Sequence, residues 1–168
     1  MKIRFTTTDC ALGRLLVAET DIGVCSITLG DDAEKLAQDL RTEYSQAELT
    51  RDTAALQSHV QTILQHLNGQ QPHLELPLDV RATAFQQRVW EELRRIPYGA
   101  TASYSEIARR LGQPSATRAV ARACATNPVA LATPCHRVVR ENGDLSGYRW
   151  GIERKRQLLA QEQRTAAK

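Results

Sequence analysis

The residues whose types could do chemistry gather in the segment Pro134-Cys135-His136-Arg137-Val138, where a thiol, an imidazole and a guanidinium follow one another. A nearby positive charge favours the thiolate, which is the nucleophilic form of cysteine, and an imidazole can take the thiol proton. Neighbours on an extended chain point to opposite sides, so we expect His136 to reach Cys135 only around a bend or through a water. Cys135 is therefore the candidate nucleophile, and the alternative is a buried, inert thiol.

The remaining cysteines are Cys10, Cys25 and Cys124. None of the four cysteines forms a C-x-x-C pair, so the spacing indicates neither a zinc cluster nor a disulfide framework. For these three residues we expect buried, reduced thiols. The sequence predicts no metal site.

Length and hydropathy restrict the class of protein. With 168 residues, 42% of them hydrophobic, the chain can bury one core, or a small domain packed on a slightly larger one. No apolar run approaches the roughly 18 residues that span a bilayer, and the start Met-Lys-Ile-Arg-Phe-Thr has no long apolar segment behind its positive charge. We expect a cytoplasmic protein with no membrane partner.

Charge is distributed unevenly along the chain. Residues 1–80 hold six Lys/Arg and twelve Asp/Glu, a net charge of −6, whereas residues 81–140 hold ten Arg and three Glu, a net charge of +7. A basic part of this kind can meet a polyanion while the acidic part is held away from it. Two solvated faces would produce the same pattern, so charge alone leaves both interpretations open.

The first half has the pattern of an α+β unit. Alternating and apolar runs predict strands at 2–8, 14–19 and 24–29, the last two joined as a hairpin across residues 21–23. Asp31 or Asp32 can cap a helix over 33–44. A second helix is marked by the apolar residues Leu56, Val60, Ile63, Leu64 and Leu67 and ends at Asn68-Gly69. We therefore expect a domain at 1–80 with a small antiparallel sheet.

The second half, 81–168, is dominated by helix signals. A capping box at Thr83 and Gln86 opens a helix that Pro97 and Gly99 end, and the stretch 70–82 before it, with two prolines, connects the halves. Further helices are predicted at 104–111, 115–125 and 152–164, and a hairpin or wing at 138–139 and 145–148.

The helices 104–111 and 115–125, separated by a turn that contains glycine, are a helix-turn-helix candidate. The second of them has mostly small side chains, so it could approach a groove closely but offers few side chains that can read base edges. This favours contact through shape and backbone, in the narrower minor groove, with Arg118 near the helix start. Paired helices in a protein core share the same spacing, so the pattern alone does not establish DNA binding.

Residues 84–162 resemble the O6-alkylguanine-DNA alkyltransferase (methylated-DNA–protein-cysteine methyltransferase) family, and in particular the C-terminal domain of the bacterial Ada protein. The motifs that carry the resemblance are SYSEIA, RAVARACATNP, PCHRV and LSGYRWG, and the opening DCALGRLLVAETDIGVCSITLG also fits, so the resemblance covers nearly the whole chain. It implies an α+β fold in which a ribonuclease H-like N-terminal domain precedes a helical, winged helix-turn-helix domain. It also implies a bacterial protein.

The resemblance implies direct-reversal DNA repair: a methyl group passes irreversibly from O6-methylguanine, and from O4-methylthymine, in duplex DNA to Cys135. The thioether product is a poor leaving group, so the protein would act once and need no cofactor. It further implies that His136 takes the proton of Cys135 through a water and that Glu162, 27 residues after Cys135, fixes the tautomer of His136. Asn127 would join the helices to the active-site turn; by local rules alone it is a helix-ending Asn before Pro.

Chemistry at guanine O6 requires the base to be flipped out of the stack. By resemblance, Arg118 fills the gap that the base leaves and Tyr104 rotates the nucleotide and contacts the guanine; a solvated arginine and a core tyrosine are the alternatives. The substrate-binding residues expected are Tyr104, Ser146, Tyr148, Val138 and Trp150. The DNA-binding residues expected are Arg118, Tyr104, Thr117, Ala119 and Arg122, and the partner is double-stranded DNA that a monomer contacts from the minor groove.

Three features depart from the family pattern. Ala132-Thr133 stand before Pro134 where relatives usually have branched apolar residues, so packing beneath Cys135 is open. The first half lacks the Cys/His set of the zinc-binding human relative, and the chain has no separate cysteine-rich domain, so phosphotriester repair is not expected. Trp150 should narrow the pocket and favour methyl over benzyl adducts.

Two other functions remain as alternatives. The first is a winged-helix DNA-binding protein without chemistry, and the second is a Cys-His hydrolase. No glycine-rich oxyanion loop or nucleophile elbow is apparent, which is against the hydrolase.

Overall fold

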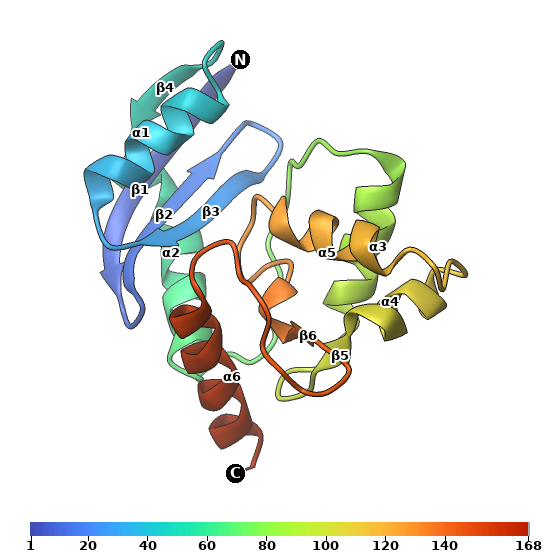
Figure 1. Ribbon diagram of the computed structural model, residues 1–168. Helices are drawn as coiled ribbons and strands as arrows, with labels where there is room; N and C mark the ends of the chain where they lie inside the picture. Colours follow the sequence, from blue (N-terminus) through green and yellow to red (C-terminus); the bar gives the residue numbers. More distant parts are fainter. Residues whose placement is uncertain (168) are drawn as a thin grey trace. The chain divides into compact units, whose positions relative to one another are not determined.

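The structure is a computed structural model that describes residues 1–167. Its internal contacts form two compact units (Figure 1). One comprises Met1–Val80 together with Pro128–Ala132, and the other comprises Arg81–Asn127 together with the described residues from Thr133 onward. Within residues 1–167, every helix is too short or too polar to cross a membrane.

The N-terminal unit is built on a four-stranded sheet. Its strands are β1 (Lys2–Cys10), β2 (Gly13–Glu19), β3 (Val24–Gly30) and β4 (Glu48–Arg51), in the order β3-β2-β1-β4. The first three are antiparallel, as the sequence predicted, but β4 runs parallel to β1, so the sheet is mixed. β4 was not predicted because three of its four residues are exposed and lack an apolar pattern.

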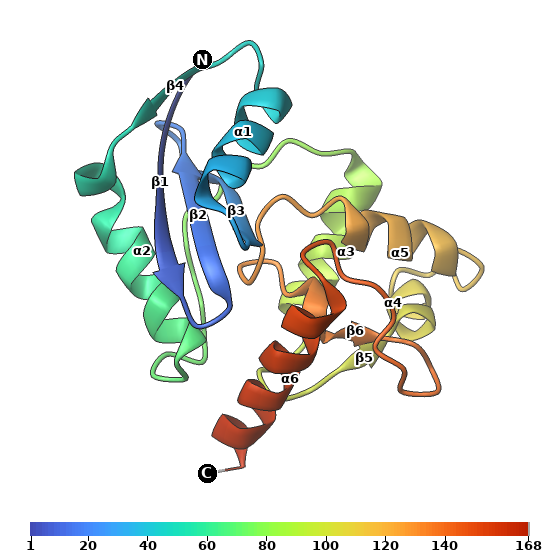
Figure 2. The same cartoon turned by 60° about the vertical axis from the view of Figure 1, so that its left-hand side comes forward.

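Two helices cover the two faces of this sheet (Figure 2). Helix α1 (Ala33–Glu43) packs on β2 and β3, and its N-terminus is capped by Asp32, whose carboxylate accepts from the Glu34 N–H. Helix α2 (Thr53–Leu67) packs on β1 and β2 and is capped by Asp52.

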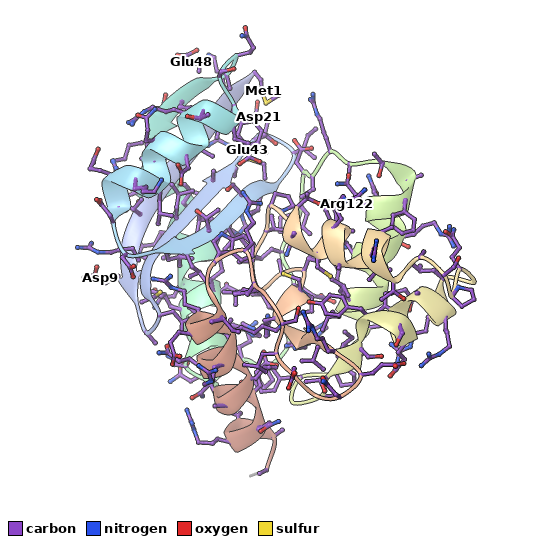
Figure 3. The ribbon with its side chains drawn as sticks, viewed as in Figure 1. Met1, Asp9, Asp21, Glu43, Glu48 and Arg122 are labelled. Atoms are coloured by element: carbon purple, nitrogen blue, oxygen red, sulfur yellow. The ribbon has the colours of Figure 1, made fainter. Side chains whose placement is uncertain are left out.

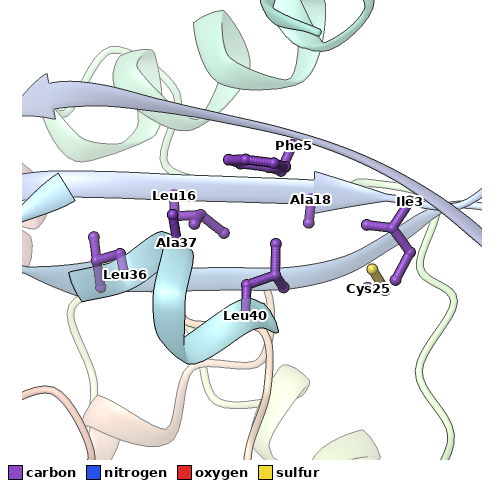
Figure 4. Close-up of a cluster of buried hydrophobic side chains, with 8 residues drawn as sticks. All are labelled: Ile3, Phe5, Leu16, Ala18, Cys25, Leu36, Ala37 and Leu40. Carbon is purple, nitrogen blue, oxygen red and sulfur yellow. The ribbon is translucent and has the colours of Figure 1, made fainter. Parts of the chain in front are cut away.

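The core beneath α1 follows from the alternation of the strands. Successive side chains of a strand point to opposite faces, so Leu16 and Ala18 of β2 lie on the α1 side while Leu15 and Val17 lie on the other. Figure 4 shows the cluster between the sheet and α1, which consists of Ile3, Phe5, Leu16, Ala18, Cys25, Leu36, Ala37 and Leu40. Every one of these side chains is at most 7% exposed.

The segment Pro128–Ala132 extends this sheet beside β3. The Ile27 N–H donates to the Pro128 carbonyl (3.0 Å), and the Ala130 N–H donates to the Ile27 carbonyl (2.9 Å). The backbone bends sharply at Leu131, which has a φ of 73°. The chain thus contributes a piece of the N-terminal unit shortly before the candidate nucleophile.

The exposed side chains of the N-terminal unit include many carboxylates. Figure 3 labels Asp9, Asp21, Glu43 and Glu48. The same figure labels Arg122, an exposed arginine on helix α5 of the C-terminal unit. The charge asymmetry of the sequence is therefore an asymmetry between the surfaces of the two units.

The C-terminal unit is mostly helical. Its helices are α3 (Ala84–Arg94), α4 (Tyr104–Arg110), α5 (Thr117–Ala125) and α6 (Ile152–Ala166). The predicted capping boxes differ in completeness: Thr83 and Gln86 exchange both hydrogen bonds, whereas Ser103 accepts from the Glu106 N–H. Helix α5 begins two residues later than predicted, because Pro114-Ser115 belong to the turn.

The predicted hairpin at 138–139 and 145–148 is wrong. The short strand β6 (Val138–Val139) pairs in parallel with β5 (Ala102–Ser103), and 145–148 has no strand. Ser146 lies in the left-handed region with a φ of 65°, which is incompatible with a regular strand. A loop from 140 to 149 therefore occupies the place of the wing.

Candidate active site

Cys135 opens a single 3-10 turn, η1 (Cys135–Arg137), between the segment 128–132 and strand β6. Its side chain is 3% exposed. The amide Nδ2 of Asn127, two residues beyond the end of α5, donates to Cys135 Sγ over 3.3 Å and to the Thr133 carbonyl over 2.8 Å. The amide thus links the end of α5 to the sulfur.

The next two side chains of the turn converge on one carboxylate of α6. His136 Nε2 lies 2.7 Å from Glu162 Oε2, and Arg137 Nε lies 2.8 Å from Glu162 Oε1. Arg137 also donates to the Ile96 carbonyl over 2.9 Å. All three side chains are buried. Arg137 therefore pairs with the carboxylate, not with the thiol that it follows in sequence.

These contacts determine the proton positions. Burial alone would raise the pKa of Glu162, but hydrogen bonds and charge from His136 and Arg137 lower it to about 2. Burial, together with the positive charges of Arg137 and Lys155, lowers the pKa of His136, although Glu162 acts in the opposite direction. A neutral His136 that faces a carboxylate through Nε2 carries its proton there. Its Nδ1 is buried and has no hydrogen-bond partner among residues 1–167, so Nδ1 is free to accept a proton.

The protonation of Cys135 reflects opposing influences. Burial raises the pKa of the thiol to about 11, while the hydrogen bond from Asn127 and the charge of Lys155 lower it. Lys155 of α6 is fully buried, and its Nζ donates to the carbonyls of Val138 (2.7 Å) and Gly147 (3.2 Å). Burial lowers the pKa of Lys155 to about 8. The larger of the two positive charges that favour the thiolate thus comes from α6, and the other belongs to Arg149.

Sequence reasoning missed the roles of Lys155 and Arg137. Lysine and arginine are rarely buried, and a lysine on a helix ordinarily indicates a solvated face. The signal available in the sequence was position: Lys155 lies seven residues before Glu162, on the same side of α6.

A cavity of about 280 Å³ opens in front of the sulfur. It is lined by Tyr104, Ala121, Cys124, Ala125, Cys135, Ser146, Gly147, Tyr148 and Arg149. The Tyr104 hydroxyl donates to Ser146 Oγ over 3.3 Å. The Tyr148 hydroxyl is buried and has no hydrogen-bond partner within the described part of the chain, residues 1–167. The cavity is therefore a mostly apolar space whose lining includes the polar residues Tyr104, Ser146 and Tyr148.

Two of the predicted substrate-binding residues lie outside this wall. Val138 is fully buried and contributes its carbonyl to Lys155. Trp150 packs edge-on against Tyr148, with ring centroids 5.2 Å apart, and beneath the guanidinium of Arg149. Trp150 thus reaches the cavity through Tyr148, so the structure does not support the expectation that its ring narrows the pocket directly.

The predicted DNA-binding residues lie on α5 and at the start of α4. Arg118 and Arg122 are exposed, one turn apart, while Thr117 and Ala119 are partly buried. The inward side of α5 consists of Val120, Ala123 and Cys124. Trp90 of α3 donates to the Ala123 carbonyl over 2.9 Å and ties α5 to the unit. The two arginines are available to a polyanion.

Comparisons with known proteins match this geometry to one family. The family model described as 6-O-methylguanine DNA methyltransferase, DNA binding domain, matches residues 84–164, and the model of its ribonuclease-like domain matches residues 3–80. A methylated-DNA–protein-cysteine methyltransferase of Mycolicibacterium paratuberculosis is 37% identical over 96% of this chain and 93% of its own length. The chain belongs to the O6-methylguanine DNA methyltransferase family.

Other members of the O6-methylguanine DNA methyltransferase family are similar over the same range. The bifunctional transcriptional activator/DNA repair enzyme Ada of Escherichia coli is 49% identical over 96% of this chain, and the chain spans 46% of the length of Ada. The crystal structure of Mycobacterium tuberculosis OGT in complex with DNA has a TM-score of 0.83 at 36% identity, over 98% of this chain and 94% of that one. The family and the α+β fold class predicted from sequence are confirmed.

Proposed function

We propose that this chain repairs DNA directly by moving a methyl group from O6-methylguanine, and from O4-methylthymine, to Cys135 in a single irreversible turnover. The observation that carries the proposal is a buried thiol that lines a cavity and accepts a hydrogen bond from an amide. The next residue in the chain is a histidine whose imidazole contacts a buried carboxylate. The bond between O6 and the methyl carbon breaks as the bond between sulfur and carbon forms. The thiol loses one proton and the guanine gains one, so the reaction balances without a cofactor.

The chain's own groups supply the proton path. The pKa of Cys135 is raised by burial to about 11, so a base must take its proton when the substrate is bound. Neutral His136 can be that base through Nδ1, with a water as the link, and Glu162 would stabilise the imidazolium that forms. Lys155 and Asn127 would stabilise the thiolate.

The cavity suits a planar purine. Tyr104, Ser146 and Tyr148 line this cavity, and the buried Tyr148 hydroxyl has no hydrogen-bond partner among residues 1–167. A hydroxyl near the purine could stabilise negative charge that develops as guanine leaves. The small side chains Ala121 and Ala125 leave room for the base. The cavity thus fits an everted guanine.

The proposed partner is double-stranded DNA. OGT of Mycobacterium tuberculosis was crystallised in complex with DNA, and it shares this fold. Exposed Arg118 and Arg122 with small side chains between them suit close approach to the minor groove, where Arg118 would fill the place of the flipped base. We propose that residues 81–168 bind DNA as a winged-helix-like domain, that residues 1–80 form a second domain, and that the protein acts as a monomer in the bacterial cytoplasm.

Intact-protein mass after mixing with a duplex that contains one O6-methylguanine tests the proposal. We expect one stable added methyl group per chain, and peptide mapping should locate it on Cys135. Cys135→Ser should gain no methyl yet bind the duplex. Cys124→Ser is the matched control, because Cys124 lines the same cavity and burial raises its pKa, but among residues 1–167 no amide hydrogen bond lowers that pKa. It should gain the methyl group as the parent does.

Unchanged mass of the parent protein, with DNA bound, would favour the winged-helix protein without chemistry. A methyl group that is released again with the thiol restored would favour hydrolysis. Methyl found on Cys124 would mean that the acceptor has been assigned to the wrong thiol.

A further inference from the structure

Thr133 is a fully buried polar residue directly before Pro134 and Cys135. A buried hydroxyl requires a hydrogen-bond partner, and the guanidinium of Arg94 supplies one, with NH2 2.9 Å from Thr133 Oγ1. Arg94 is the last residue of α3 and is otherwise exposed. A valine, which has nearly the same shape as threonine, would need no such partner at this position. Packing alone therefore does not explain why a threonine that needs an arginine partner stands at this position.

The backbone carbonyl of Thr133 is hydrogen-bonded to two groups of the active site. It accepts from Asn127 Nδ2 (2.8 Å) and from the Cys135 N–H (2.9 Å). The same Nδ2 donates to Cys135 Sγ. A shift of Thr133 would therefore move the amide donor and the sulfur relative to each other.

Helix α3 is a rigid support for this arrangement. Val89 and Leu93 are fully buried, and Trp90 Nε1 donates to the Ala123 carbonyl in the interior. Because α5 leads directly into Asn127, α3 is tied to both ends of the Asn127–Thr133 hydrogen bond: through Trp90 at one end and through Arg94 at the other. Site residues that are anchored to a helix keep their positions more precisely than residues that are held by a loop alone.

We propose that Arg94 and Thr133 form a positioning pair that fixes the active-site turn to α3 and thereby keeps the Asn127 amide on the Cys135 sulfur. The inference rests on the proposed methyl transfer to Cys135. Neither residue touches the reacting atoms: Arg94 acts through Thr133, and Thr133 acts through Asn127.

Arg94→Met removes the donor and keeps the length of the side chain. We expect single-turnover methyl transfer to slow by roughly tenfold, because a misplaced reacting group loses that much rate or more. In DNA-free protein, the pH midpoint for alkylation of Cys135 by iodoacetamide, followed by peptide mass, should rise, because the amide donor that favours the thiolate is displaced. The ionisable groups that otherwise act on Cys135 are Lys155, Arg149, Cys124, Tyr104 and Tyr148. His136 is its neighbour in the same turn, and the substitution leaves all of these groups in place.

The neighbouring Arg95 offers a matched control. Its side chain is 69% exposed and pairs with Glu92, so Arg95→Met removes the same charge from the same helix end without touching the turn. It should leave both the rate and the midpoint unchanged. Thr133→Val removes the same hydrogen bond from the other side and should reproduce the effects of Arg94→Met. Thr133→Ser keeps the hydroxyl, so it should retain the midpoint even if it melts earlier.

A purely structural role predicts a different pattern. If Arg94→Met and Thr133→Val lower the melting temperature but leave the rate and the alkylation midpoint of the folded protein at parental values, the positioning role is excluded. If the effects of the two substitutions add in the double variant, the residues do not act as a pair. Failure of the proposed function would appear elsewhere, as a parent protein that gains no methyl group at all.

Discussion

Glu162 is the residue on which the buried charges of the site depend. Glu162→Gln would leave Arg137 without a counter-charge in the interior, and breaking a buried pair in this way costs about 3–5 kcal/mol. The amide would also stop fixing the proton of His136, so we expect methyl transfer to slow by about 100-fold or more. Urea unfolding and single-turnover kinetics measure the two effects. Glu153→Gln, exposed on the same helix, should change neither.

Acid titration gives Glu162 a second test. Its pKa is about 2 in the folded protein, below the ordinary value of about 4.3 for an unfolded chain. A lowered carboxyl pKa contributes stability that is fully present above the unfolded value and is lost as pH falls toward the folded one. The parent should therefore lose stability between about pH 4 and pH 2 more steeply than Glu162→Gln. Parallel curves of unfolding free energy against pH would contradict this assignment.

Lys155 should control the reactivity of the thiol below about pH 8, the value to which burial lowers its own pKa. Lys155→Met removes a positive charge that favours the thiolate, so the pKa of Cys135 should rise further. Alkylation by iodoacetamide at pH 7 should become several-fold slower, and the difference from the parent should shrink above pH 8, where Lys155 is neutral. Arg156→Met, which alters an exposed neighbour, serves as the control. An equal difference at pH 7 and pH 9 would argue against a charge effect.

At the scale of elements, the loop before β5 and the end of α6 are in close contact. Gly99 has a φ of 87°, and a Cβ built there would lie 2.6 Å from Ala166 Cβ. Gly112 also has a positive φ, of 73°, but a Cβ there meets nothing within 4 Å. Gly112→Ala should therefore cost only the backbone strain, about 1–2 kcal/mol. Gly99→Ala should cost clearly more in a thermal melt, and equal losses would show that α6 yields easily.

Local sequence signals predicted most of the elements. Caps, glycine ends and apolar spacing identified β1 to β3 and helices α1 to α6, since these features depend on residues close in sequence. Pairing between distant segments was not predictable in this way. Val138-Val139 carried the signal of a strand, but its partner is Ala102-Ser103, and β4 pairs with β1 despite its polar residues.

The same distinction holds for the candidate site. The residue types of Cys135, His136 and Asn127 and their spacing drew attention to the turn. The buried environment that brings Arg137 and Lys155 to it depends on how α6 packs, which no local pattern encodes. The role of Arg94 was likewise not predictable from the sequence, because an arginine at the end of a helix ordinarily contacts only solvent or the helix end.

At the scale of the whole molecule, the sign of the net charge differs between the two units. We therefore expect DNA affinity to depend on arginines of the C-terminal unit. Arg118→Ala and Arg122→Ala, on exposed positions of α5, should each weaken binding to any duplex sequence. The slope of the logarithm of affinity against the logarithm of salt concentration should fall by about one for each. Fluorescence anisotropy at several salt concentrations measures it. Arg41→Ala, an exposed arginine of α1, should have little effect, and a comparable loss there would contradict the assignment of the binding surface.

The short stretch Pro128–Ala132 has a consequence for dissecting the protein. This segment hydrogen-bonds to β3. A fragment that begins at residue 81 would keep the segment but lack β3, so these backbone groups would lose their partners. The segment ends only three residues before Cys135. Simple truncation is therefore a poor route to a minimal methyl acceptor. Co-expression of the severed first part, supplied in trans, is the better design.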